Sequence, residues 1–324
     1  MLPLQIYKMK TKIIFLFSIL LVVIFWGIVN GPSNLSFQQL LLPQNHDILW
    51  LRLSRVSAAI ILGVGLSISG IALQAILRNP LAEPYLLGTS SGAGLGAVIA
   101  LITGMGTIYL PLAAFIGAIF TVVLVYNLAR QQNKVPVQAL VLSGVIVSIA
   151  FSAIMVFLIS LSSNEALHGA MWWLWGSTQV YDARLLAVVG ITVFLSVLVI
   201  YFFAQDLNAI SIGEEEAMHL GINSEALKKI LFFITSLITA CAVSLCGIIG
   251  FVGLVIPHIM RRVVGPNHKV LIPATCIMAS IFMIACDIIS RTMFSPLEIP
   301  IGVITAVIGA PIFIILLKKK QRIT

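Results

Sequence analysis

The polar stretch from Gln205 to Lys229 reads QDLNAISIGEEEAMHLGINSEALKK and interrupts an otherwise apolar chain. Five of the eleven acidic residues of the chain fall in it: Asp206, Glu214, Glu215, Glu216 and Glu225. Its apolar and small residues recur at helical spacing opposite the glutamates: Ile212, Ala217, Leu220 and Gly221. This pattern predicts a short amphipathic helix that ends at a Gly-Ile-Asn stop. Because so short a helix is unstable alone, it must lie either on its own bundle or on another protein.

The composition outside this stretch is that of a membrane protein. Hydrophobic residues make up 60% of the 324 residues and charged residues only 9%, which predicts an all-α polytopic membrane protein in contact with lipid. The net charge of +8 could suggest a nucleic-acid partner, but the basic residues gather at the ends of apolar runs, which is a topology signal. The four cysteines lie inside apolar segments without a Cys-x-x-Cys pair and read as small buried hydrophobes.

Hydrophobic runs predict the membrane spans. The first run follows three lysines and lacks a small-x-small cleavage site, so we interpret it as a retained helix rather than a signal peptide. Six spans precede the polar stretch, at about 13–29, 53–77, 85–103, 108–129, 137–161 and 183–204. Three further runs follow it, at about 230–251, 270–289 and 301–317.

An even number of crossings requires one more span after the polar stretch. Three crossings would place the basic tail outside, against the positive-inside tendency. The segment 253–264 is the candidate, although it is too short to span about 30 Å of hydrocarbon and carries Pro257, His258, Arg261 and Arg262, so protein must shelter it. About ten crossings then place both termini and the polar stretch in the cytoplasm. Fifteen of the nineteen Lys and Arg residues lie on that side: Lys8, Lys10, Lys12, Arg78, Arg130, Lys134, Lys228, Lys229, Arg261, Arg262, Lys269, Lys318, Lys319, Lys320 and Arg322.

The four remaining arginines fall at the outer ends of spans: Arg52, Arg55, Arg184 and Arg291. Arg52 and Arg55 are three residues apart and share one helix face. Two interpretations stay open for them, contact with lipid headgroups and a basic docking patch for an acidic external partner. Asp287 precedes Arg291 by four residues, so an ion pair within one helix explains this intramembrane carboxylate most simply.

Small and hydroxylated residues are concentrated in the second span and at the start of the third. The second span contains Gly63, Gly65, Ser67, Ser69 and Gly70. The third span begins with the run from Gly88 to Gly94. Tight helix packing is the simpler explanation. A polar path for a hydrated solute is the alternative, and Gln74 would then belong to it.

Several kinds of chemistry are absent from the sequence. There is no Gly-x-x-x-x-Gly-Lys-Ser/Thr loop for nucleotide, no His-Glu-x-x-His spacing for a metal, and no catalytic constellation. An ion-driven carrier normally keeps carboxylates along its pathway, and the spans here carry almost none. We therefore expect a non-enzymatic pore without cofactor or metal, whose energy enters from another protein.

A set of motifs in this order resembles the FecCD family, the permease subunits of ATP-binding-cassette (ABC) importers for iron-siderophores, haem and cobalamin. The likeness covers nearly the whole chain after the first helix. The matching residues are Arg52-Leu53-Ser54-Arg55, Gln74, Asn79 to Pro84, Leu87 to Ala93, Gly213-Glu214, Ala217, Leu220-Gly221, Phe251 to Leu254, Pro257-His258, Arg261, Asp287, Arg291, Glu298, Pro300, Gly302, Gly309, Pro311 and Phe313. Ser54 departs from the family, where proline is usual at that place.

The resemblance implies a fold and a set of site residues. It implies a single permease domain over residues 1–324 with the type II importer architecture, ten helices, and a cytoplasmic coupling loop at about 205–229. The coupling helix would carry Gly213, Glu214, Ala217, Leu220 and Gly221, and a binding protein would dock on Arg52, Arg55 and Arg291. The translocation path and inner gate would include Gln74, Asn79, Ser90, Ser91, Val137 and Gln138.

The resemblance also implies partners and a mechanism. The chain would form a homodimer in the cytoplasmic membrane of a prokaryote, with two ATPase subunits that bind ATP and Mg and an extracytoplasmic substrate-binding protein. ATP binding would then drive alternating access through the coupling helices. The alternative is an ion-coupled secondary carrier that acts without an ATPase. The sequence does not distinguish a siderophore, haem or cobalamin as the solute.

Overall fold

The computed structural model of the chain describes residues 2–33, 35–131 and 135–321 and is built from helices throughout that part. Lys134 and Arg322, which the charge argument counted, lie outside it. The helices are α1 (Leu2–Val29), α2 (Phe37–Leu40), η1 (Pro43–Asn45), α3 (His46–Ile76), η2 (Pro84–Leu87), α4 (Thr89–Ile102), η3 (Thr107–Tyr109), α5 (Leu110–Ala129), α6 (Val137–Ser160), α7 (Asn164–Trp175), α8 (Ala183–Phe202), α9 (Ala204–Ile212), α10 (Glu214–His219), α11 (Ser224–Cys246), α12 (Val252–Val264), α13 (His268–Thr292) and α14 (Ile301–Gln321).

The ten predicted crossings correspond to ten of these helices, so the all-α class is confirmed. Seven helices in the described residues are long and apolar enough to cross a membrane, and α4 and α14 are shorter apolar helices. The tenth is α12, which has 13 residues and contains Pro257. Its residues from Val252 to Pro257 are buried, so surrounding helices shelter it as expected.

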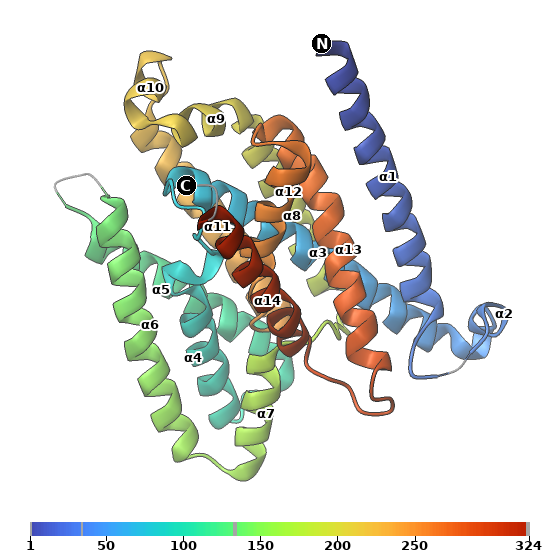
Figure 1. The fold of residues 1–324 in the computed structure, drawn as a ribbon. Coiled ribbons are helices and arrows are strands. Elements are labelled where there is room, and N and C mark those ends of the chain that lie inside the picture. The colour runs from blue at the N-terminus through green and yellow to red at the C-terminus, as the bar shows by residue number, and fades with distance from the viewer. Residues whose placement is uncertain (1, 34, 132–134, 322–324) are drawn as a thin grey trace.

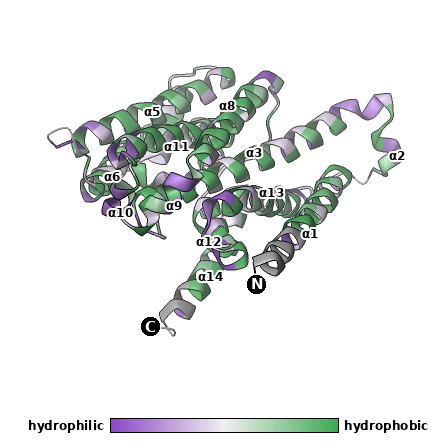
Figure 2. Ribbon diagram, turned by 90° about the horizontal axis from the view of Figure 1, so that it is seen from above, coloured by the Kyte–Doolittle hydropathy of each residue, from purple (hydrophilic) through white to green (hydrophobic). Residues whose placement is uncertain are grey.

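The two ends of the bundle differ in what they present. Figure 1 shows α9 and α10 at one end and α2 and α7 at the other, and Figure 2 shows hydrophilic residues on α9 and α10 beside mainly hydrophobic bundle helices. Lys12 donates to the Val263 carbonyl at 2.7 Å, and Arg262 donates to the Leu316 carbonyl at 3.1 Å. These contacts bring the start of α1, the end of α12 and the end of α14 together. Following the charge distribution, we name the α9–α10 end the inner end and the α2–α7 end the outer end.

Two predicted span boundaries need correction. The second span begins at His46, seven residues before the predicted residue 53, because the preceding 3-10 turn at Pro43–Asn45 leads directly into α3. The seventh begins at Ser224 and ends at Cys246 rather than at residue 251, since Gly247 adopts a φ of 74° that a helix cannot continue through. Phe251 also has a positive φ of 69° and precedes α12, so α11 and α12 meet at an irregular break.

Helix α3 forms the centre of the bundle and packs against α8, α11, α12 and α13. Its glycines serve close packing, because a Cβ at Gly70 would strike the backbone of Gly253 on α12. A Cβ at Gly92 on α4 would likewise lie 2.5 Å from the Gly117 carbonyl on α5. The small residues therefore let backbones approach closely, which is the simpler of the two explanations that the sequence allowed.

Candidate functional site

The outer end holds a buried cluster of charges around Asp287. Arg55 donates from Nε to Asp287 Oδ1 at 2.9 Å and from Nη1 to the Glu298 carboxylate at 2.9 Å. Thr178 donates its hydroxyl to the same Asp287 oxygen at 2.5 Å, and Gln179 donates to Glu298 at 2.9 Å. The cluster thus ties α3 to α13, to the segment after α7 and to the segment before α14.

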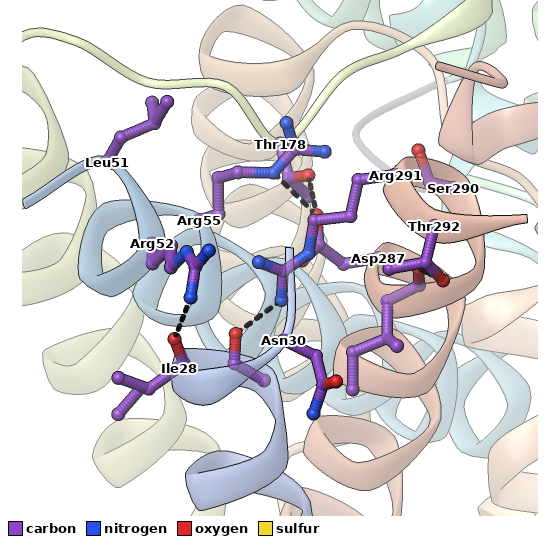
Figure 3. Close-up of polar contacts among 12 residues, drawn as sticks. Ile28, Asn30, Leu51, Arg52, Arg55, Thr178, Asp287, Ser290, Arg291 and Thr292 are labelled. Carbon is purple, nitrogen blue, oxygen red and sulfur yellow. Dashed lines mark hydrogen bonds and ion pairs between the residues drawn. The ribbon is translucent and has the colours of Figure 1, made fainter. Parts of the chain in front are cut away.

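Two more arginines complete this outer cluster. Arg291 Nε lies 3.0 Å from Asp287 Oδ2, which confirms the predicted ion pair within α13, although its angle is too poor for a hydrogen bond. Arg291 also donates to the Gly27 carbonyl at 2.5 Å. Arg52 reaches the end of α1, where it donates to the Val29 carbonyl at 2.5 Å and to Ser33. Figure 3 shows Arg55 and Arg291 turned toward Asp287.

The three arginines of the predicted docking patch, Arg52, Arg55 and Arg291, are buried in this structure. Their side chains are 3%, 3% and 1% exposed. A buried charge is costly without a counter-charge or hydrogen bonds, and each of the three guanidinium groups has a partner within the chain. Among the described residues, Arg291 Nη1 alone of their terminal nitrogens is buried without a hydrogen-bond partner. Arg184 remains exposed at this end. Sequence reasoning assigned no role to Glu298, Thr178 or Gln179, since nothing in their local pattern reveals that Arg55 contacts them across the fold.

The inner end presents the predicted coupling helix as an exposed element. Gly213 lies between α9 and α10, Ala217 is buried, and Gly221 has a φ of 80° that ends the turn. Three apolar side chains nearby are exposed: Ile212 (74%), Met218 (59%) and Leu220 (71%). Only Ala217 of the expected apolar face packs on the chain itself. The remaining apolar side chains are available to another protein, which favours the second of the two surfaces that the sequence left open.

Glu214 lies at the start of α10 and binds within the chain. Lys228 Nζ approaches Glu214 Oε2 at 2.6 Å and Glu225 at 3.3 Å. Arg78 from the end of α3 lies 3.7 Å from the other Glu214 oxygen. Glu215 and Glu216 are exposed instead. Glu214 therefore fastens α10 to α11, while its contact with Arg78 at the end of α3 is loose.

The predicted gate residues lie beside this fastening. Val137 and Gln138, at the start of α6, line an open cleft of about 310 Å³ together with Glu214 and Lys228. Gln138 is exposed and Val137 is partly buried. The fold thus brings the predicted gate and the predicted coupling helix to one place, although they are more than seventy residues apart in the sequence.

The other predicted path residues are mostly occupied by internal contacts. Gln74 donates to the carbonyls of Ala82 and Gly253 and accepts from Arg261, so its amide has no group left for a solute. Ser91 donates to the Gly88 carbonyl. Ser90 is partly exposed, and Asn79 is exposed at the inner end, where it caps Leu81 N–H. In the single chain, Gln74 is therefore a packing residue.

Glu83, in the double-proline turn after α3, is a partly buried carboxylate to which sequence reasoning assigned no role. Its Oε1 accepts the Phe251 backbone N–H at 2.9 Å, at the break between α11 and α12. Burial raises the pKa of the Glu83 carboxyl, and this hydrogen bond opposes the rise. Among the described residues no cation is within ion-pair distance of Glu83, and no cluster of three His, Cys, Asp or Glu could hold a metal.

The helices, the sheltered short span and the exposed inner helix define a polytopic membrane permease of the type II ABC importer architecture. A solved structure described as a metal-chelate type ABC transporter in an inward-facing conformation matches with a TM-score of 0.88 and 32% identity, over 96% of this chain and 99% of that one. The family model for the FecCD transport family matches residues 17–319. The chain belongs to the FecCD transport family.

Two curated relatives differ in what their names say they carry. The cobalamin import system permease of Halobacterium salinarum is 38% identical over 84% of this chain and 73% of its own length. The molybdate import system permease of Haemophilus influenzae is 34% identical over 86% of this chain and 83% of its own length. The family membership makes the chain an ABC importer permease, and the relatives leave its solute undetermined.

Proposed function

We propose that the chain is the membrane subunit of an importer for a metal chelate or a corrinoid, driven by two separate ATPase subunits. The observation that carries the coupling is the exposed apolar group of Ile212, Met218 and Leu220 on α9–α10. Exposure of such apolar side chains to water is unfavourable, and their burial in a cleft of a partner protein would be favourable. The resemblance to the family supplies the identity of that partner.

The path from the partner to the pore follows from the inner contacts. A force that the partner exerts on α10 would pass through Glu214 to Lys228 on α11. It would then reach the cleft that Val137 and Gln138 line. Movement of these helices would open or close the inner side of a pore between two copies of the chain, which is alternating access. The cytoplasmic membrane of a prokaryote, with both termini inside, is the setting that fits the charge distribution.

Docking of a substrate-binding protein requires the outer end to rearrange. Arg55 and Arg291 are buried, and Glu298, at 27% exposure, is the accessible carboxylate of the cluster. We propose that a partner carboxylate takes the place of Glu298 on Arg55. This exchange would break the tie between α3 and the segment before α14, and it would therefore transmit docking into the bundle.

Reconstitution in proteoliposomes tests the proposed function. The chain with its ATPase and binding protein should accumulate labelled solute only with ATP inside, and siderophore, haem, cobalamin and molybdate can be compared directly. A secondary carrier would instead move solute when the chain alone is given an ion gradient. Uptake by the chain alone would overturn the proposal in favour of that carrier.

A further inference from the structure

A second cleft at the inner end is lined by two arginines and by no carboxylate among the described residues. It measures about 530 Å³ and lies between the end of α3, helix α9 and the turn from α12 to α13. Arg78, Arg261 and His268 line it, and no Asp or Glu does. The N-terminus of α13, a helix of 25 residues, opens at the same place and adds the positive end of its dipole.

Arg261 is largely buried and lacks an acidic partner. Its Nη1 donates to Gln74 Oε1, and no ion pair links Arg261 to a carboxylate among the described residues. Gln74 cannot turn away, because its Nε2 donates to the Ala82 and Gly253 carbonyls at 3.1 and 3.2 Å. A sheltered guanidinium held only by a neutral amide carries a desolvation cost that an external anion would offset.

His268 is a fixed, buried part of the cleft wall. The side chain is 3% exposed, and Asn208 Oδ1 fixes it by binding both its backbone N at 2.9 Å and its Nδ1 at 2.7 Å. Its Nε2 is buried and has no hydrogen-bond partner among the described residues. Because Asn208 Oδ1 can only accept, Nδ1 donates and Nε2 of the neutral ring is an acceptor, so His268 shapes the cleft while Arg78 and Arg261 carry its positive charge.

Arg78 adds a half-exposed positive charge to the lining of the cleft. Its side chain is half exposed, and its one carboxylate contact, to Glu214, is long at 3.7 Å. Such a long, exposed ion pair contributes little to the stability of the fold, so the Arg78 guanidinium can turn into the cleft.

We propose that this cleft binds a phosphate group. Two guanidinium groups match phosphate oxygens through paired N–H donors, and the volume exceeds what a halide or a lone carboxylate would fill. The phosphate can come from a soluble phosphate compound or from the headgroup of an acidic phospholipid at the inner surface. The site does not depend on the proposed transport function, because the isolated chain is expected to bind.

The test uses the full chain purified in neutral detergent and in nanodiscs. In detergent, inorganic phosphate is titrated against potassium chloride of equal ionic strength while the unfolding midpoint is followed. In nanodiscs, phosphatidylcholine is compared with a mixture containing phosphatidylglycerol, and native mass spectrometry counts retained phosphatidylglycerol. We expect saturable stabilisation by at least one probe: phosphate alone identifies a soluble source, and phosphatidylglycerol alone identifies a lipid.

Variants of the two lining arginines test whether the probes bind in this cleft. Arg78→Gln removes a half-exposed charge with little risk to folding, and Arg261→Lys keeps the charge but loses the guanidinium fork. Each is expected to weaken probe binding about tenfold, the loss of one charge-assisted contact. Arg184→Gln, at the exposed outer arginine, should bind as the wild type does. The proposal would be overturned if the wild type showed no saturable binding, or if Arg78→Gln bound the probe as tightly as the wild type. If Arg261→Lys does not fold, the comparison of Arg78→Gln with the wild type is sufficient.

Discussion

Charges that are sheltered from water have different partners in the two halves of the bundle, where the outer ones are buried and the inner ones are partly buried. At the outer end Arg55 and Arg291 share Asp287, so sheltered charges neutralise one another. Toward the inner end Glu83 is held by a backbone N–H and Arg261 by an amide, both neutral groups. The difference indicates that the outer end is closed upon itself, whereas the inner half keeps charges that can respond to molecules arriving from outside the chain.

The largest effect is expected from Asp287→Asn. This change leaves two buried guanidinium groups without their shared carboxylate, which costs about 3–5 kcal/mol of folding free energy. Thermal unfolding of the purified chain in detergent measures it. Glu215→Gln, at an exposed carboxylate on α10, is the matched control and should unfold with the wild type. Equal midpoints for Asp287→Asn and wild type would show that the outer cluster does not stabilise the fold.

Removal of the exposed inner apolar group should abolish transport without unfolding the chain. In Met218→Ala with Leu220→Ala we expect transport to fall by about tenfold or more, because buried apolar anchors dominate interfaces. Stability should change by less than about 0.5 kcal/mol, as for other surface substitutions. Leu297→Ala removes a comparably exposed leucine at the outer end and should transport normally. Full ATP-driven uptake by the double variant would refute the coupling role of α10.

Glu83→Gln should produce a smaller, pH-dependent gain in stability. Burial raises the pKa of Glu83 in the folded state, so ionisation opposes folding above the ordinary unfolded pKa of about 4.3 and costs nothing well below it. Glutamine keeps an oxygen for the Phe251 N–H and carries no charge. The variant should therefore be more stable than wild type at pH 8, and the difference should vanish near pH 4. A difference that is independent of pH would exclude ionisation as its cause.

The smallest effect on stability is expected from Glu298→Gln. Arg55 keeps Asp287 in this variant, and Glu298 is partly solvated, so the loss should not exceed about 1 kcal/mol. The same change should tighten binding of the substrate-binding protein, since the competing carboxylate is gone. Binding to immobilised wild-type and variant nanodiscs measures this, and weaker binding by Glu298→Gln would contradict the exchange of carboxylates.

The sequence was sufficient for the architecture because hydrophobic runs report directly on helices in a bilayer. The even crossing number and the sheltered segment around Pro257 followed from charge placement, and the Asp287–Arg291 pair followed from helical spacing. The span boundary at Gly247 was missed, because apolar residues continue past the glycine and hydropathy does not register its positive φ.

Local sequence patterns could not predict contacts between segments that lie far apart in the chain. From its place at the outer end of a helix, Arg55 was interpreted as a lipid contact or part of a docking patch, and only the fold reveals that Glu298 meets it. Gln74 was assigned to a polar path because its amide could hydrogen-bond a hydrated solute, and only the fold shows that this amide is engaged with Arg261 and two carbonyls.

Helix α3 extends unbroken for 31 residues, from just before Arg52 at the outer cluster to Gln74 near the α10 contacts. At about 1.5 Å per residue it is a rod roughly 46 Å long. A tilt of about 10° around its middle would displace each tip by roughly 4 Å in opposite directions. Because Gly70 packs on α12 and Gly63 on α13, such a tilt would move these contacts as well, and the loss of an outer ion pair would then reach the opposite side of the membrane.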